Sequence, residues 1–217
     1  MFSKFAIFGN VSTIGLRERK KAATRAALSE AAIRLACERG VEHVTSDAIA
    51  EAAGVSPRTF HNYFANKEEA IFAGMAEFGG EMLAAMRALP VGEPVWEAVR
   101  QVIVGLARER PDTTDLMVAV VRLMERSPAL AVRHDAMREE AGRALAGVVA
   151  ERTGTDPDRD LYPHLIGAAL HAAVTAAVNL WRVGKTDRDL ADLLDEAFDQ
   201  FRAGLPDPSA LIEARRQ

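Results

Sequence analysis

Residues 56–70 read SPRTFHNYFANKEEA, and their order of rings and polar groups predicts a short amphipathic helix. Pro57 suits the first position of a helix, where a missing N–H costs nothing. At 100° per residue, Phe60 and Phe64 fall about 40° apart and define an inward face. Arg58 and Asn62 fall near the opposite pole. The stretch therefore predicts a helix of under two turns with a core face and a polar face.

The polar face of this predicted helix carries the groups that read bases and phosphates. Arginine bonds guanine bidentately and asparagine does so with adenine, as Arg58 and Asn62 would. Thr59 and His61 flank them, and Tyr63 stands where the helix ends, with its hydroxyl free to turn toward a DNA backbone. This composition is typical of the recognition helix of a helix-turn-helix, whose N-terminal residues enter the major groove.

Cap residues on both sides of this helix support the same interpretation. Thr45 is placed to cap a preceding helix of about two turns that ends at Gly54, and Ser56 is placed to cap the next helix. Asn66 is followed three residues on by Glu69, as in a capping box, which predicts the start of a third helix. Two short helices would then be joined by the three-residue turn GVS.

Residues 45–69, TSDAIAEAAGVSPRTFHNYFANKEE, resemble the DNA-binding motif of the tetracycline-repressor (TetR) family of bacterial transcriptional regulators. The positions that match the family pattern are Thr45, Ile49, Ala50, Ala53, Gly54, Val55, Ser56, Thr59, Tyr63, Phe64, Lys67 and Glu68. The resemblance extends over residues 16–39 in front and covers about a quarter of the chain. One departure is His61, where the family usually carries a phosphate-binding tyrosine.

The resemblance implies roles for individual residues. Thr45, Tyr63 and Lys67 would contact phosphates, and Arg58, Thr59 and Asn62 would approach bases. Thr45 also serves as a cap, and Tyr63 as part of the core, so these residues have structural interpretations as well. The full set of predicted DNA-binding residues is Thr45, Ser56, Pro57, Arg58, Thr59, His61, Asn62, Tyr63 and Lys67.

The rest of the chain predicts helices separated by Pro and Gly, and no strand pattern. Residues 16–39 form a predicted helix with a basic N-terminal half, containing Arg17, Arg19, Lys20, Lys21 and Arg25. Further helices are expected at 67–88, 94–109, 112–125, 129–152, 158–183 and 188–203. The fold class is all-α, with a loose arm at 1–15, a helix-turn-helix domain at 16–66, an effector-binding and dimerisation domain at 67–205 and a loose tail at 206–217.

Charge is distributed unevenly along the chain. Residues 1–67 carry ten Lys or Arg and six Asp or Glu, whereas residues 68–217 carry seventeen and twenty-five, although the net charge is only −4. A basic N-terminal block on an acidic body indicates that the N-terminal part meets a polyanion, although a solvated helix face would look the same.

Other features of the composition narrow the class of protein. The single cysteine, Cys37, excludes an internal disulfide, favours a reduced compartment and is interpreted as a packed thiol. Residues 161–181 are alanine-rich but contain Pro163, His164, His171 and Asn179, so we expect no membrane span. Phosphate-binding loops, nucleophile elbows and metal-spaced His or Cys clusters are missing from the sequence. We therefore expect no enzyme, no metal and no cofactor.

The family resemblance implies a homodimer and a small-molecule effector. Leu165, Ala168, Ala172 and Leu180 would pack across a two-fold axis, with an intrachain core helix as the alternative. An apolar or acyl-CoA-like effector would occupy the C-terminal body. Its candidate contacts are Phe78, Met82, Trp96, Met117, Val121, Met124, His171 and Asn179, some of which form a stripe that plain core packing also explains.

The sequence thus predicts a cytoplasmic, nucleoid-associated regulator, a repressor, that binds palindromic operator DNA as a dimer and is released by the effector. One alternative is an architectural or activating DNA-binding protein whose body dimerises without a ligand. Another is a helical small-molecule-binding protein that has lost DNA binding, which would require a disrupted recognition helix.

Overall fold

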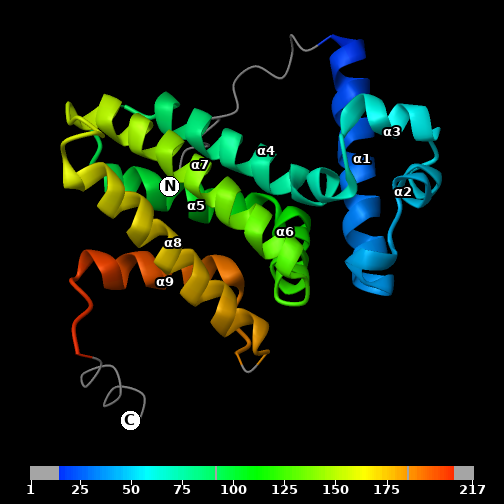
Figure 1. The fold of residues 1–217 in the computed structure, drawn as a ribbon. Helices are drawn as coiled ribbons and strands as arrows, with labels where there is room; N and C mark the ends of the chain where they lie inside the picture. The colour runs from blue at the N-terminus through cyan, green and yellow to red at the C-terminus, as the bar shows by residue number, and fades with distance from the viewer. Residues whose placement is uncertain (1–14, 91, 185, 208–217) are drawn as a thin grey trace. The chain divides into compact units, whose positions relative to one another are not determined.

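The computed structural model describes residues 15–90, 92–184 and 186–207, and for residues 111–114 it describes the backbone alone. This part of the chain is all-α, as predicted, and contains no strand (Figure 1). The elements are α1 (Leu16–Arg39), a 3₁₀ turn η2 (Val41–His43), α2 (Ser46–Ala52), α3 (Pro57–Tyr63), α4 (Lys67–Ala88), α5 (Val95–Glu109), α6 (Pro111–Met124), α7 (Pro128–Thr153), α8 (Leu161–Arg182) and α9 (Leu190–Arg202). Every helix expected from the sequence is present, with ends that differ by at most three residues.

Local chemistry explains where the helices start and stop. Gly40 follows α1 with φ 84°, and Gly54 follows α2 with φ 69°, a left-handed conformation that glycine adopts without a Cβ clash. The Thr45 hydroxyl accepts a hydrogen bond from the N–H of Ala48 at the start of α2. Thr45 satisfies a backbone N–H at a helix start, and the two glycines let the chain leave a helix without steric strain. The helix boundaries therefore follow local signals in the sequence closely.

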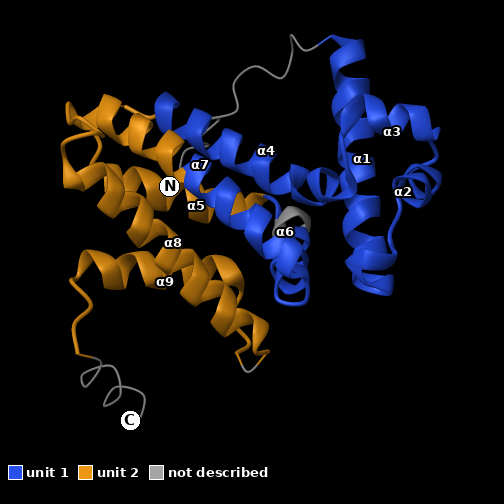
Figure 2. Cartoon of the chain, viewed as in Figure 1, with its two compact units in different colours: residues 1–88, 110–141 blue, residues 89–109, 142–217 orange. Residues whose placement is uncertain are grey.

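The chain divides into two compact units, which we describe separately (Figure 2). Unit 1 comprises residues 1–88 and 110–141, and unit 2 comprises residues 89–109 and 142–217. The predicted helix-turn-helix domain falls within unit 1, where α1 packs against α2, α4 and α6. The predicted boundary at residues 66/67 stays a prediction. The predicted arm and tail lie almost entirely outside the described residues.

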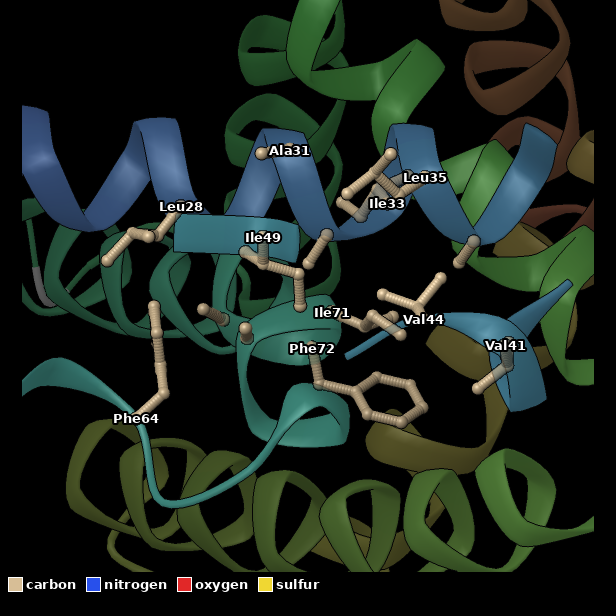
Figure 3. Close-up of a cluster of buried hydrophobic side chains, with 14 of the residues drawn as sticks. Leu28, Ala31, Ile33, Leu35, Val41, Val44, Ile49, Phe64, Ile71 and Phe72 are labelled. Carbon is tan, nitrogen blue, oxygen red and sulfur yellow. The ribbon is translucent and has the colours of Figure 1, made fainter. Parts of the chain in front are cut away.

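The core of unit 1 joins the helix-turn-helix to α4 and α6. Side chains from α1, α2 and α4 form one buried cluster, in which Ile49 and Ile71 are fully buried (Figure 3). Phe60 of α3 belongs to the same cluster and is also fully buried. Truncating a buried phenylalanine of this kind costs about 3–5 kcal/mol. The two phenylalanines predicted to face inward, Phe60 and Phe64, are 0% and 1% exposed, which confirms the predicted core face of the recognition helix.

Unit 2 is held together by contacts of α9 with α5 and with α8. The Trp96 ring of α5 lies 4.8 Å from the Phe198 ring, and its Nε1–H donates to the Phe198 carbonyl oxygen at 3.1 Å. Arg100 of α5 donates to Asp195 of α9 at 2.8 Å. An aromatic contact and a charged contact therefore fix α9 along α5.

α8 is apolar on an exposed face as well as on a buried one. Ile166, Leu170 and Ala173 are buried, whereas Leu165 and Leu180 are 53% and 51% exposed. By length and composition alone α8 would be able to cross a membrane, with a mean hydropathy of 1.4 over its most apolar window. Core helices of soluble proteins meet the same criteria, so this hydropathy is weak evidence for a membrane span.

Candidate nucleic-acid interface

The α2–turn–α3 segment is built by two caps and one tight connection. The Val55 N–H donates to the Ala50 carbonyl oxygen at 2.9 Å, which folds the turn back onto α2. The Ser56 Oγ accepts from the N–H of Thr59 at 3.1 Å and lies 2.9 Å from its hydroxyl. Ser56 is therefore the N-cap that the sequence predicted, and its bond to Thr59 ties the two hydroxyls to the start of α3.

The faces of α3 separate as the sequence predicted. Arg58, His61 and Asn62 are exposed, and Phe60 on the opposite face is fully buried. The Phe60 and Phe64 ring centroids lie 5.8 Å apart, and the His61 ring meets the Phe60 ring edge-on at 5.3 Å. Arg58 has no ion pair among the described residues, so its guanidinium is available to an external acceptor.

The C-terminal end of α3 is held by an arginine from α1. Arg25 donates from Nη1 to the Tyr63 carbonyl oxygen at 3.3 Å and from Nε to Glu77 Oε1 of α4 at 2.8 Å. In the sequence, Arg25 belongs to the group of basic residues in the N-terminal half of this helix. A signal for its different role was available, since Arg25 lies one turn before Leu28 and therefore near the buried stripe of α1.

The remaining basic residues of that group are exposed at the N-terminal half of α1. Arg17, Arg19, Lys20 and Lys21 have no carboxylate partner within the described ranges. Cations there oppose the helix dipole, so they do not stabilise α1. Their exposure suits contact with a polyanion.

Lys67 has a defined internal role. Its ammonium donates to the carbonyl oxygens of Val41 at 2.8 Å and Val44 at 3.1 Å, which closes the end of η2 against the start of α4. Two of the three N–H donors are thereby used within the chain, and one remains. The predicted cap at the same helix start is present, since the N–H of Glu69 donates to Asn66 Oδ1 at 2.8 Å. The Glu69 carboxylate accepts from the N–H of Ala65 and not from that of Asn66, so the reciprocal bond of the predicted capping box is displaced by one residue.

The residues predicted to contact an effector fall into both units. In unit 1, Phe78 and Met117 line one cavity between α1, α4 and α6, while Met82 is buried and Val121 and Met124 are half-buried. Met124 packs against the core cluster.

In unit 2, the Trp96 indole N–H is hydrogen-bonded to the Phe198 carbonyl oxygen of α9. His171 and Asn179 are exposed on α8. The described residues therefore bring together Phe78 and Met117, and the other members of the predicted set stay predictions. No cluster of three or more metal-binding side chains occurs among the described residues.

Comparisons with known proteins agree with this geometry. Residues 28–73 match the family model described as "Bacterial regulatory proteins, tetR family", and residues 93–206 match the one described as "MftR C-terminal domain". The transcriptional regulator TcmR of Streptomyces glaucescens is 34% identical over 200 residues, which are 88% of each chain.

Two solved structures share the fold at low sequence identity. The fatty acid degradation regulator FadR of Bacillus halodurans has a TM-score of 0.60 at 19% identity, covering 84% of this chain and 96% of that one. A SmeT–triclosan complex has a TM-score of 0.59 at 21% identity, covering 86% and 98%. Members of the matched family are DNA-binding transcriptional regulators and not enzymes. On its helix-turn-helix, its C-terminal match and its similarity to TcmR, this chain belongs to the TetR family of transcriptional regulators.

Proposed function

We propose that this regulator is a ligand-responsive repressor that binds palindromic operator DNA as a homodimer in the cytoplasm and leaves the operator when a small molecule binds. The observation that carries the proposal is the polar face of α3, where Arg58 and Asn62 are exposed opposite the fully buried Phe60. An intact recognition helix argues against a protein that has lost DNA binding.

The predicted contacts fall into two classes. Arg58, Thr59 and Asn62 would read base edges, and the basic residues of α1, with Thr45, Tyr63 and the remaining donor of Lys67, would meet phosphates. Ser56 and Pro57 would serve by fixing the start of α3. His61 would donate from its imidazole at the position where family members carry tyrosine.

The exposed face of α8 supports the homodimer. Leu165, Ala168, Ala172 and Leu180, which were predicted to pack across a two-fold axis, are all exposed in the single chain. Such a stripe at helical spacing needs a partner surface, and a second copy of the same stripe is self-complementary under two-fold symmetry. A two-fold dimer presents two identical recognition helices, and its operator is then a palindrome.

An apolar effector is supported by the cavity that Phe78 and Met117 share. Triclosan, the compound named in the SmeT complex, is a small molecule bound by a protein of similar fold. A thousandfold release from DNA requires about 4 kcal/mol of coupling between the two sites. By reciprocity, operator DNA must weaken effector binding by the same factor.

The test selects binding sites from random duplex DNA and then titrates the complex. We expect the selected sequences to be palindromic and two chains to protect both half-sites. Apolar compounds bound by the protein should lower the affinity for the selected operator. If a compound binds tightly and operator affinity stays constant, the regulator acts without a ligand. That outcome would support the alternative, an architectural or activating DNA-binding protein whose body only dimerises. A single unrepeated half-site with one chain bound would contradict the dimeric repressor.

A further inference from the structure

One cavity of unit 1 is lined by both apolar and charged side chains. It has a volume of about 110 Å³ and lies between α1, α4 and α6. Ile33, Ile71, Met75, Phe78, Met117 and Val120 are among its apolar lining residues. Methionine side chains adapt their shape to irregular contents, so Met75 and Met117 allow the cavity to fit a compact group of somewhat different outline.

The charged residues at this cavity are mostly acidic. Glu30, Glu77 and Glu81 line it together with a single cation, Arg110, which is ion-paired with Glu81. Glu77 is ion-paired with Arg25, which lies outside the lining. Glu30 is exposed and has no hydrogen-bond or ion-pair partner among the residues that the structure describes. The lining therefore has an excess of negative charge, and the Glu30 carboxylate has no partner among the described residues.

We infer that this cavity binds an organic cation with a compact apolar body, the body among Phe78, Met75 and Met117 and the charge at Glu30 and Glu77. Carboxylates in the lining favour a cation by direct attraction, and the face of an aromatic ring attracts cations as well. An acyl-CoA carries several phosphate charges, which the same carboxylates repel, so the cavity does not suit that ligand class. This inference rests on the proposed function and specifies the chemistry of its effector.

The position of Glu77 connects this cavity to the recognition helix. Its Oε1 accepts from Arg25 Nε at 2.8 Å, and the same guanidinium donates to the Tyr63 carbonyl oxygen at the end of α3. A bound cation competes with Arg25 for Glu77. Its binding removes the carboxylate that helps to position Arg25 at the end of α3, and because this ion pair is partly exposed, the expected change in operator affinity is modest.

The probes for this inference are benzylammonium, benzyl alcohol and benzoate, which share one ring and differ in charge. Calorimetric titration of the full chain at pH 7 should show that benzylammonium binds roughly threefold to tenfold more tightly than benzyl alcohol, as partly exposed ion pairs allow. Benzoate should bind most weakly. Methionine methyl NMR should show shifts at Met75 and Met117. Equal binding of the three probes, or shifts only at other methionines, would overturn the inference.

Two substitutions test separately the charge of the cavity lining and the space for the ring of the ligand. Glu30→Lys should abolish the preference for benzylammonium over benzyl alcohol. Glu38→Lys makes the same charge change two turns further along α1, at an exposed residue that pairs with Arg34 and does not line the cavity, and should keep the preference. Gly74→Ala adds a Cβ that meets Ser29 Oγ at 4.0 Å, so it reduces the cavity without a clash. It should weaken benzylammonium and benzyl alcohol by the same factor. Retained preference in Glu30→Lys would contradict the assigned role of the carboxylates.

A third measurement tests the connection to DNA. Benzylammonium should weaken binding to operator DNA selected from random duplexes, and benzoate should not. Failure to select any DNA would count against the proposed regulator itself. Selection of a palindrome that another apolar compound releases, with no binding of benzylammonium, would overturn the cation site alone. Binding of benzylammonium at Met75 and Met117 without any change in operator affinity would overturn the competition for Glu77.

Discussion

Arg25 of α1 places its guanidinium carbon 4.5 Å from the centre of the Phe64 ring, directly beyond the end of the recognition helix. The same side chain reaches the Tyr63 carbonyl oxygen and Glu77 of α4. One residue thus joins three elements that are distant in sequence. The orientation of α3 depends on this contact as well as on the buried Phe60.

Replacing Arg25 by glutamine should lower the free energy of unfolding by about 1–2 kcal/mol, because a cation–π contact and a hydrogen bond to a carbonyl are lost. The ion pair with Glu77 is 31% and 48% exposed and adds little. Arg34→Gln, on the same helix in an exposed pair with Glu38, is the matched control and should change stability by less than about 0.5 kcal/mol. Urea denaturation measures both. Equal losses would mean that Arg25 is only a surface residue.

Arg58→Ala should leave folding unchanged, because the side chain is exposed opposite Phe60. It should cost about 1–3 kcal/mol per half-site on the selected operator and much less on random DNA. Arg58→Lys should recover charge but not bidentate bonding, so specificity should remain low. Fluorescence anisotropy on both kinds of DNA distinguishes the cases. A loss of the same size on random DNA would show that Arg58 only neutralises the backbone.

Lys67→Ala should destabilise the fold and weaken DNA binding together. The carbonyl oxygens of Val41 and Val44 lose a charged donor, which we expect to cost about 1–3 kcal/mol of unfolding free energy. Binding to all DNA sequences should weaken, and the slope of log affinity against log salt should flatten by about one unit if the third donor meets a phosphate. A slope unchanged in the folded variant would leave Lys67 with its internal role alone.

Leu165→Glu should dissociate the proposed dimer, because it places a carboxylate in the exposed apolar stripe of α8. Gln101→Glu introduces the same group at an exposed position of α5 and should leave the assembly intact. Sedimentation velocity measures the assembly state, and the affinity for the palindromic operator should fall with the dimer. A Leu165→Glu protein that still sediments as a dimer would show that α8 is not the interface.

Cys37 should alkylate slowly in the folded protein. Burial raises the pKa of its thiol, and this outweighs Arg122 and Arg126, which lower it. The folded chain thus holds the proton to higher pH than the unfolded chain, so stability should decrease as pH rises through the thiol pKa of the unfolded chain. Iodoacetamide labelling at pH 8 should be faster in urea. Arg126→Gln should slow labelling of the folded protein further, and faster labelling would contradict the arginine effect.

Local features of the sequence were sufficient for the helices and for the faces of α3. Thr45, Ser56 and Asn66 cap through hydrogen bonds within three residues of the chain, and Phe60 and Phe64 follow from helical period. Interactions of this range do not depend on the rest of the fold, which is why they were predictable. The prediction of a packed Cys37 was wrong, because the C-terminal turn of α1 leaves the residue largely exposed, and its thiol is only partly withdrawn from water.

Only the tertiary structure decided what the long polar side chains do. Arg25 looked like one more surface cation and is instead bonded to Tyr63 and Glu77, which lie 38 and 52 residues away. Lys67 reaches carbonyl oxygens 26 and 23 residues earlier in the chain. Trp96 likewise looked free for a ligand and donates to Phe198.

The physical reason is the reach of these groups. A capping hydroxyl or a buried ring has its position set by the backbone of its own helix, so the sequence alone determined the recognition helix and its exposed Arg58. A guanidinium or ammonium at the end of a flexible stem takes whichever acceptor the packing of other helices brings within hydrogen-bond distance. The packing of α1 against α4 therefore decided that Arg25 holds the end of α3 and that Glu77 lines the cavity beside it.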